Sequence, residues 1–242
     1  MKQKIKPKSD VFGEALWDHF NHPKSKELIT WTDLTEEDSV PLSYFFRGFM
    51  EMPKLEQHAL ELTKGKTLDI GCGSGCHSLY LQNEKGMEVT GIDNSLGAIK
   101  TAKKRGVKNL IQSSIFDCKT TSYDTLLLLM NGPGICGTLE KLEELLLKLK
   151  SLLSENGQIL LDSSDLIYLF DETPKGEKIV SGDQYYGELD YGIRFEGQTE
   201  NFPWLYVDFG NLSHFAKEAG LKAELILEGE NWDYLARLTR EY

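Results

Sequence analysis

Apolar and polar positions follow two different patterns along the chain. Near the N-terminus apolar residues recur four positions apart, beginning at Phe12, which predicts a helix over residues 10–29. A second helix is expected over residues 53–64, because the proline at its start suits the first turn of a helix. From residue 67 onward short apolar runs alternate with helical stretches, which indicates a different architecture.

Apolar runs of strand length recur between residues 67 and 162, separated by helical segments. The run at 125–130 is apolar without alternation, which is typical of a strand buried on both faces. Strands that alternate with helices form a parallel, doubly wound sheet. The sequence therefore predicts a Rossmann-like α/β fold whose first strands cover residues 67–70, 88–92, 108–112, 125–130 and 158–162.

The C-terminal third contains strands without intervening helices. Two runs, at 185–189 and 193–199, predict a β-hairpin that turns at Asp190-Tyr191-Gly192. Two further strands, at 222–228 and 232–239, are joined by so short a turn that they must pair antiparallel. These last strands would complete a mostly parallel, seven-stranded sheet with an antiparallel C-terminal strand.

A glycine-rich turn, Gly71-Cys72-Gly73-Ser74-Gly75, lies where the first predicted strand meets a helix. Glycine lets the backbone turn tightly and lets a ligand approach closely. Ligands of open α/β sheets bind beyond the carboxyl ends of the strands. Asp93 closes the second strand, where a carboxylate can accept hydrogen bonds from both ribose hydroxyls. A ligand that contains a nucleoside is therefore expected across this turn.

Two residues favour S-adenosylmethionine (SAM) over a dinucleotide. The dinucleotide pattern GxGxxG would place glycine or alanine at position 76, where this chain has Cys76. Asp69, two positions before Gly71, can meet the methionine ammonium of SAM directly or through water. An NAD(P)-dependent oxidoreductase is the alternative from another enzyme class. A non-catalytic protein that keeps a SAM-type fold is the alternative without turnover.

The chain resembles the class I SAM-dependent methyltransferases. Segments 69–75 and 89–95 together carry a specific match, and segments 123–131 and 157–161 match later strands of that family. The resemblance implies transfer of the SAM methyl group to a small-molecule acceptor by in-line displacement, with S-adenosylhomocysteine (SAH) as the product. The cofactor-binding residues that it implies are Asp69, Gly71, Cys72, Gly73, Gly75, Asp93, Asn94, Ser114, Ile115, Met130 and Asn131.

The adenine end departs from the family's pattern at one position. The family often has an acidic residue after the third strand, where this chain has Ser114. A serine hydroxyl can accept a weaker hydrogen bond from the adenine amine, or it can be simply a polar loop residue. Ile115 can supply a backbone N–H and an apolar wall.

No catalytic base is assigned from the sequence. Methyl transfer from an activated sulfonium depends mainly on positioning, and a base is needed only where the nucleophile holds its proton strongly. The segment 130–134 follows the fourth strand, on the acceptor side of the family's pocket. The hairpin and the aromatic N-terminal residues would either roof the acceptor pocket or pack at the sheet edge. Further acceptor-side candidates are His77, Asp162, Asp165, Trp204, Tyr206 and His214.

Charge and composition narrow the range of partners. A net charge of −11 argues against nucleic acid, whose phosphates repel an acidic surface. The sequence has neither an apolar run of membrane-spanning length nor a secretory signal. The four cysteines are sparse, so reduced thiols, a cytoplasmic protein and no metal site are expected. We expect a monomer or homodimer that acts on a small molecule.

The same patterns suggest a division of the chain. Residues 1–62 are expected to form a tail and a helical cap segment. Residues 63–242 are expected to form the methyltransferase domain, with a hairpin insert at about 176–206.

Overall fold

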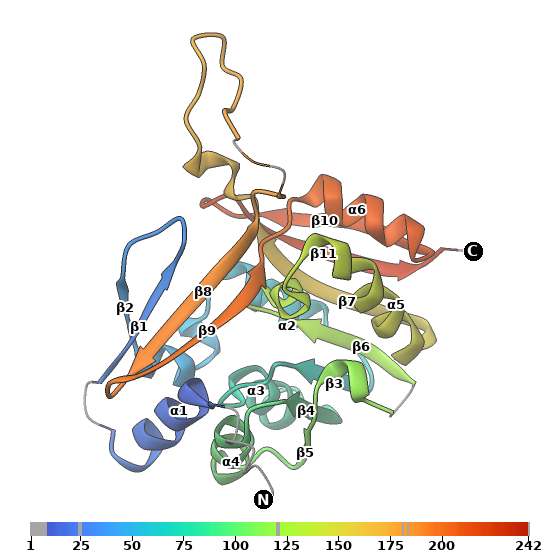
Figure 1. Ribbon diagram of the computed structural model, residues 1–242. Coiled ribbons are helices and arrows are strands. Elements are labelled where there is room, and N and C mark those ends of the chain that lie inside the picture. Colours follow the sequence, from blue (N-terminus) through green and yellow to red (C-terminus); the bar gives the residue numbers. More distant parts are fainter. Residues whose placement is uncertain (1–8, 24–25, 120–121, 181, 183, 242) are drawn as a thin grey trace, which may run out of the picture.

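The structure is a computed structural model that describes residues 9–23, 26–119, 122–180, 182 and 184–241. Two sheets lie side by side in it, with helices around the larger one (Figure 1). The helices are α1 (Val11–Asn21), α2 (Lys54–Leu62), α3 (Cys76–Asn83), α4 (Leu96–Arg105), α5 (Leu142–Leu152) and α6 (Phe209–Glu218). Short 3₁₀ helices are η1 (Leu42–Phe46), η2 (Phe49–Glu51), η3 (Ile115–Asp117), η4 (Gly132–Cys136), η5 (Leu139–Lys141) and η6 (Leu166–Leu169).

The larger sheet confirms the predicted Rossmann-like fold. Its strand order is β10-β11-β7-β6-β3-β4-β5, parallel from β7 to β5 and antiparallel where β11 meets β7 and β10. Its strands are β3 (Thr67–Ile70), β4 (Val89–Asp93), β5 (Asn109–Gln112), β6 (Tyr123–Leu128), β7 (Leu153–Ser164), β10 (Leu221–Glu228) and β11 (Asp233–Arg240).

Apolar side chains from the helices cover both faces of this sheet. The leucine-rich face of α5 packs with α6 against one face, through residues such as Leu146 and Leu212. Helices α2 and α3 cover the other face, through Leu60 and Leu81. The central strand β6 is buried along Leu126–Leu128, as expected for a strand covered on both sides.

A second, four-stranded antiparallel sheet was not predicted. Its order is β2-β1-β8-β9, and it joins the N-terminal segment to the hairpin (Figure 1). Its strands are β1 (Glu27–Thr32), β2 (Asp38–Pro41), β8 (Glu188–Phe195) and β9 (Gln198–Leu205). The predicted hairpin exists, and its partners come from a distant part of the chain.

The first helix and the hairpin turn differ from the sequence prediction. The first helix ends at Asn21 instead of continuing to residue 29, because residues 27–32 pair with β2 and β8 as strand β1. The hairpin turns at Glu196-Gly197, whose φ angles of 48° and 78° are both positive. Residues 190–192, predicted as the turn, lie within β8, where Gly192 gives room to the ring of Trp31.

Helix α1 is attached to the larger sheet through α4. The Asp10 carboxylate caps α1 by accepting from Gly13 N at 3.2 Å, and it also accepts from Gly97 N at 2.9 Å. A Cβ on Gly97 would overlap the backbone of Gly13, so glycine permits this close helix contact. In the part of the chain that the structure describes, no helix is long and apolar enough to cross a membrane.

Candidate functional site: a cavity between the two sheets

The glycine-rich turn connects β3 to α3 at the carboxyl edge of the larger sheet. Gly71 N donates to Ile92 O at 2.8 Å, which fixes the turn against β4. Gly71 and Gly73 have φ angles of 72° and 53°, a region that other residues rarely adopt. A Cβ added to Gly71 would meet no atom within 4 Å, so the backbone there faces open space.

Gly75 has a different role from the one predicted. Its φ angle is 87°, and it is the N-cap residue of α3. A Cβ there would collide with the side chain of Val107, and Gly75 is not among the residues that line the cavity. Its glycine character therefore serves the packing of α3.

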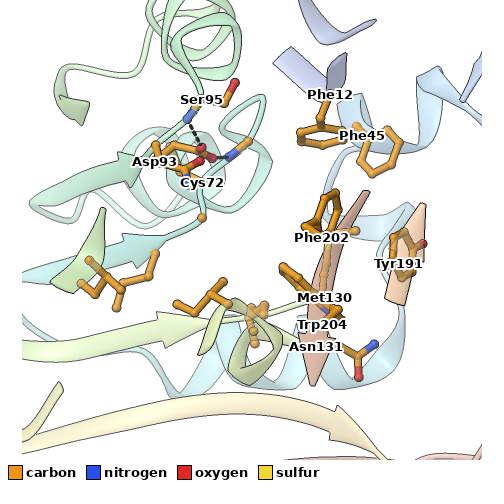
Figure 2. Close-up of a pocket in the computed structure, with 18 of the residues that line it drawn as sticks. Phe12, Phe45, Cys72, Asp93, Ser95, Met130, Asn131, Tyr191, Phe202 and Trp204 are labelled. Carbon is orange, nitrogen blue, oxygen red and sulfur yellow. Dashed lines mark hydrogen bonds between the residues drawn. The ribbon is translucent and has the colours of Figure 1, made fainter. Parts of the chain in front are cut away.

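Asp93 lies beside the glycine-rich turn at the end of β4. Its Oδ2 accepts from Gly73 N at 2.9 Å and its Oδ1 accepts from Ser95 N at 2.9 Å, as the dashed lines in Figure 2 mark. Burial raises the pKa of this carboxyl, partly offset by these two N–H donors. Each carboxylate oxygen keeps a lone pair for a further donor.

The turn after β6 holds two residues in left-handed backbone conformation. Met130 and Asn131 have φ angles of 66° and 56°, which is strained for residues other than glycine. Asn131 N donates to Asp162 Oδ2 at 3.2 Å, and Asn131 Oδ1 accepts from Ser164 Oγ at 3.3 Å. The strand β6 ends at Leu128, two residues earlier than predicted, which places both residues at the cavity wall.

A cavity of about 1260 Å³ extends from the glycine-rich turn to the four-stranded sheet. It is lined by ten of the predicted cofactor-binding residues, that is, by all of them except Gly75. Typical ligand cavities measure about 300–1,000 Å³, so this one has room for two ligands at once.

Aromatic side chains from the smaller sheet and the N-terminal segment form the wall opposite Asp93 (Figure 2). Tyr191 and Phe202 stack with ring centroids 5.6 Å apart, and Phe202 meets Trp204 edge-on at 5.8 Å. Phe12 packs edge-on against Phe45 at 5.1 Å. We name this wall, Phe12, Phe45, Tyr191, Phe202, Trp204 and Tyr206, the aromatic wall.

A family model described as a methyltransferase domain matches residues 62–235. A SAM-dependent methyltransferase from Bacteroides fragilis, solved in complex with SAH, is 43% identical over 96% of this chain and 95% of that chain, with a TM-score of 0.88. The chain belongs to the SAM-dependent methyltransferase family. Its cofactor is SAM, and the alternative of an NAD(P)-dependent oxidoreductase falls away.

Other relatives of this methyltransferase are more distant or much longer. Phosphoethanolamine N-methyltransferase 1 of Zea mays is 33% identical over 106 residues, which are 38% of this chain and 21% of that protein. The chain thus spans about a fifth of the length of that curated relative. The CcbJ methyltransferase from Streptomyces caelestis shares the fold at 13% identity, over 80% of this chain and 98% of that chain, with a TM-score of 0.57.

The turn of this methyltransferase fits SAM in shape and chemistry. The open backbone at Gly71 admits a ligand that a side chain would exclude. The Asp93 carboxylate suits ribose hydroxyls, which are hydrogen-bond donors. Ser114 and Ile115 line the cavity as predicted, although the Ser114 hydroxyl already accepts from Phe116 N at 3.3 Å.

A chain of charged groups with little exposure lines one part of the cavity. Arg47 Nη2 lies 2.5 Å from Glu56 Oε1, and His77 Nε2 lies 2.7 Å from Glu56 Oε2. Asp69 is 2% exposed, and its Oδ2 accepts from Ser78 Oγ at 2.6 Å. Burial favours the neutral imidazole, yet the hydrogen bond to Glu56 and the charge of Asp69 together raise the pKa of His77. His77 is therefore held by carboxylates, with its ring turned to Glu56.

The acceptor-side candidates separate clearly in the structure. His77, Asp162, Trp204 and Tyr206 line the cavity, whereas Asp165 and His214 are not among its lining residues. Asp165 caps η6 by accepting from Ile167 N at 2.9 Å. The sequence analysis missed Arg47, Glu56 and the individual rings of the aromatic wall, because only the pairing of β1 with β8 brings the N-terminal segment to the site. Within the described residues, no group of three or more His, Cys, Asp or Glu side chains is placed to hold a metal ion.

Proposed function

We propose that this protein transfers the methyl group of SAM to a small-molecule acceptor held against the aromatic wall. The supporting observation is the cavity of about 1260 Å³, which runs from Asp93 to the aromatic wall and is large enough for both molecules. A concave cavity with aromatic walls suits a small, partly apolar acceptor better than a macromolecule.

The residues predicted from the sequence would bind different parts of SAM. Asp93 would hold the ribose, Asn94 and Ile115 would lie at the adenine, and the backbone of Gly71 and Gly73 would face the methionine part. When bound, SAM supplies a methyl group on a positively charged sulfur. The protein's own part is to orient the two molecules in line and to keep water out, which accelerates the transfer by positioning.

Calorimetric titration with SAH tests the cofactor site. We expect SAH to bind and NAD not to bind, and we expect Asp93→Ala to weaken SAH binding at least about tenfold, since two hydroxyl contacts to a charged group are lost. Asp171→Ala is the matched control, because Asp171 is exposed and does not line the cavity. Equal SAH affinity in the wild type and Asp93→Ala would refute the assignment of Asp93.

The domain division, the cellular location and the oligomeric state of the protein are also proposed. We propose that residues 63–242 form the methyltransferase domain and that residues 1–62 serve as its cap. We propose a cytoplasmic protein, which the small number of cysteines in the sequence supports. We propose a monomer or homodimer, to be decided by light scattering on the purified protein with and without SAH.

A further inference from the structure

Asp162 is a buried carboxylate that faces the cavity without a complete set of partners. It lies near the end of β7, it is 9% exposed, and it lines the cavity. Its Oδ2 accepts from Asn131 N, while its Oδ1 has no hydrogen-bond partner among the described residues. Burying a carboxylate oxygen without a hydrogen-bond donor costs free energy. This position therefore favours a ligand that supplies a hydrogen-bond donor.

Among the residues that the structure describes, no Lys, Arg or His side chain forms an ion pair with Asp162. The charged groups nearest to it belong to the chain of charged groups on the cavity wall, and they are committed elsewhere: Arg47 and His77 both bind Glu56. Burial raises the pKa of Asp162 to about 7, and the charge of Glu56 acts in the same direction. The backbone N–H groups of Asn131 and Met130 and the charge of His77 oppose this rise. The carboxyl is therefore able to exchange a proton near neutral pH.

Two tyrosines line the same cavity as Asp162 and lie near enough for its charge to act on their phenols. Burial raises the pKa of the phenols of Tyr44 and Tyr206, and the charge of Asp162 contributes in the same direction for both. Tyr206 belongs to the aromatic wall. Tyr44 lines the same cavity and is the chain neighbour of Phe45, another member of that wall. Aromatic faces attract cations and, together with a carboxylate, form a binding site for an ammonium group.

A second cavity of about 400 Å³ lies on the outer side of Tyr191 and Tyr206, which line both cavities. Its lining includes Glu36, Asp38 and Asp233, and no lysine or arginine is among its described lining residues. A passage lined by carboxylates attracts cationic ligands and repels anionic ones.

Resting on the proposed function, we infer that the acceptor is a small amine, which binds as an ammonium between the aromatic wall and Asp162, and that Asp162 takes its proton before methyl transfer. The ammonium gives one proton to Oδ1, which leaves a lone pair on nitrogen. That lone pair forms the new N–C bond while the C–S bond breaks and its electrons pass to sulfur. The products are a methylated ammonium, SAH and one proton, which leaves Asp162 for the solvent.

An amine fits this base better than an alcohol does. An ammonium has a pKa of about 10, as in lysine, and it is lowered further in an apolar site. The proton of an alcohol is held far more strongly, so a carboxylate with a pKa near 7 is a poor base for it. An acceptor with a net negative charge would meet the carboxylates of both cavities.

The test compares an amine with its alcohol analogue on the SAH-saturated protein. We use phenethylamine and 2-phenylethanol, which differ only in the polar group, and we measure both affinities by calorimetry. The wild type should bind the amine at least about tenfold more tightly, because a charge-assisted hydrogen bond is available only to the ammonium. Asp162→Asn should lose this preference, and Asp165→Asn, the same change three residues away at a position outside the cavity lining, should keep it.

Equal binding of the two probes to the wild type, or an amine preference that survives in Asp162→Asn, would overturn the inference. The SAH affinity, measured first, separates this result from a failure of the proposed function. If SAH does not bind, the proposed function fails, and the same probe pair on the ligand-free protein still decides the role of Asp162. Carbon-13 NMR of the wild type gives a test that needs no variant. Phenethylamine should lower the pH at which the Asp162 carboxyl titrates, 2-phenylethanol should not, and an unmoved titration contradicts the inference.

Discussion

Glu56 lies between two cationic side chains in the interior of the protein. It bonds to Arg47 and to His77, and its side chain is 4% exposed. Burial alone would raise the pKa of this carboxyl, but the hydrogen bond and charge of His77 and the charge of Arg47 lower it below its usual value. The glutamate is thus ionised at neutral pH, and it offsets the cost of burying its partners.

Removing this negative charge should destabilise the protein strongly. In Glu56→Gln the guanidinium of Arg47 stays buried without a counter-charge, and a broken buried ion pair costs about 3–5 kcal/mol. Urea unfolding followed by circular dichroism measures the free energy of unfolding. Glu61→Gln, on the same helix with a side chain that is 57% exposed, is the matched control and should change it by less than about 0.5 kcal/mol. Similar losses in the two variants would contradict the prediction.

His77 should make stability depend on pH in a defined direction. The pKa of His77 in the folded protein is raised above 6.5, the ordinary value for histidine. Its charged form therefore stabilises the fold, and this contribution is complete at pH values below 6.5. The contribution disappears as the pH rises through the folded pKa. The difference in free energy of unfolding between the wild type and His77→Gln should therefore be largest below pH 6.5 and should shrink as the pH rises above that value. A difference that stays constant or grows over this range would refute the assignment.

Individual residues of the site could be predicted where the backbone motif is local. The positions of Gly71, Gly73 and Asp93 follow from a strand, a turn and the end of the next strand, which are all near in sequence. Asp162 could be proposed only as one of several candidates. Its unmatched oxygen depends on what surrounds it in three dimensions, and a sequence contains no direct record of that.

At the scale of elements, strands of the larger sheet were predictable because each carries its own apolar pattern. The N-terminal strands were not. Residues 27–32 have a mixed pattern in which Leu28 is buried and the remaining residues are not, so they lack the signal of a strand until β8 pairs with them. The hairpin turn was misplaced because Gly192 resembles a turn glycine, whereas its actual function is to give room to Trp31.

The corrected hairpin turn makes a stabilising substitution available. A two-residue loop with positive φ at both positions favours Asn-Gly, and this chain has Glu196-Gly197 there. Glu196→Asn should raise the free energy of unfolding by about 0.5–1 kcal/mol, because asparagine adopts the left-handed conformation more readily. The ion pair that it removes, Glu196 with Lys26, is exposed and contributes little.

A substitution with the opposite expected effect at the same site provides the control, and both variants are compared by thermal unfolding. Glu196→Val should lower the stability, since a β-branched residue at positive φ is strained. Equal melting temperatures for the two variants would show that the turn conformation is not limiting.

At the scale of the whole molecule, the N-terminal segment and the larger sheet meet at one cavity. Ser9, Asp10 and Phe12, at the start of α1, line the same cavity as the glycine-rich turn. Helix α1 also contacts α4, the helix that follows Asp93, through Gly13 and Gly97 (Figure 1). We therefore expect a ligand at Asp93 to stabilise the N-terminal segment as well as the larger sheet.

Hydrogen exchange should record this coupling. Addition of SAH should slow amide exchange in residues 71–75 and also in α1 and η1, because ligand binding stabilises every element that closes the site. The edge strand β10 should serve as the internal control, since it lies at the far edge of the larger sheet and should exchange at an unchanged rate. Slowing confined to the glycine-rich turn would show that the cap responds independently.

The pairing of β1 with β8 also has a consequence for how the chain is made. Ile29 finds its partner only when Arg194 has been synthesised, which at about 5–20 residues per second is a delay on the order of ten seconds. During that interval one edge of β1 has no neighbour, and unpaired strand edges promote association with other chains. The parallel strands β3 to β7 of the larger sheet are synthesised earlier and lie close together in sequence. The smaller sheet, with the cavity wall that it forms, is therefore more exposed to errors during this part of translation.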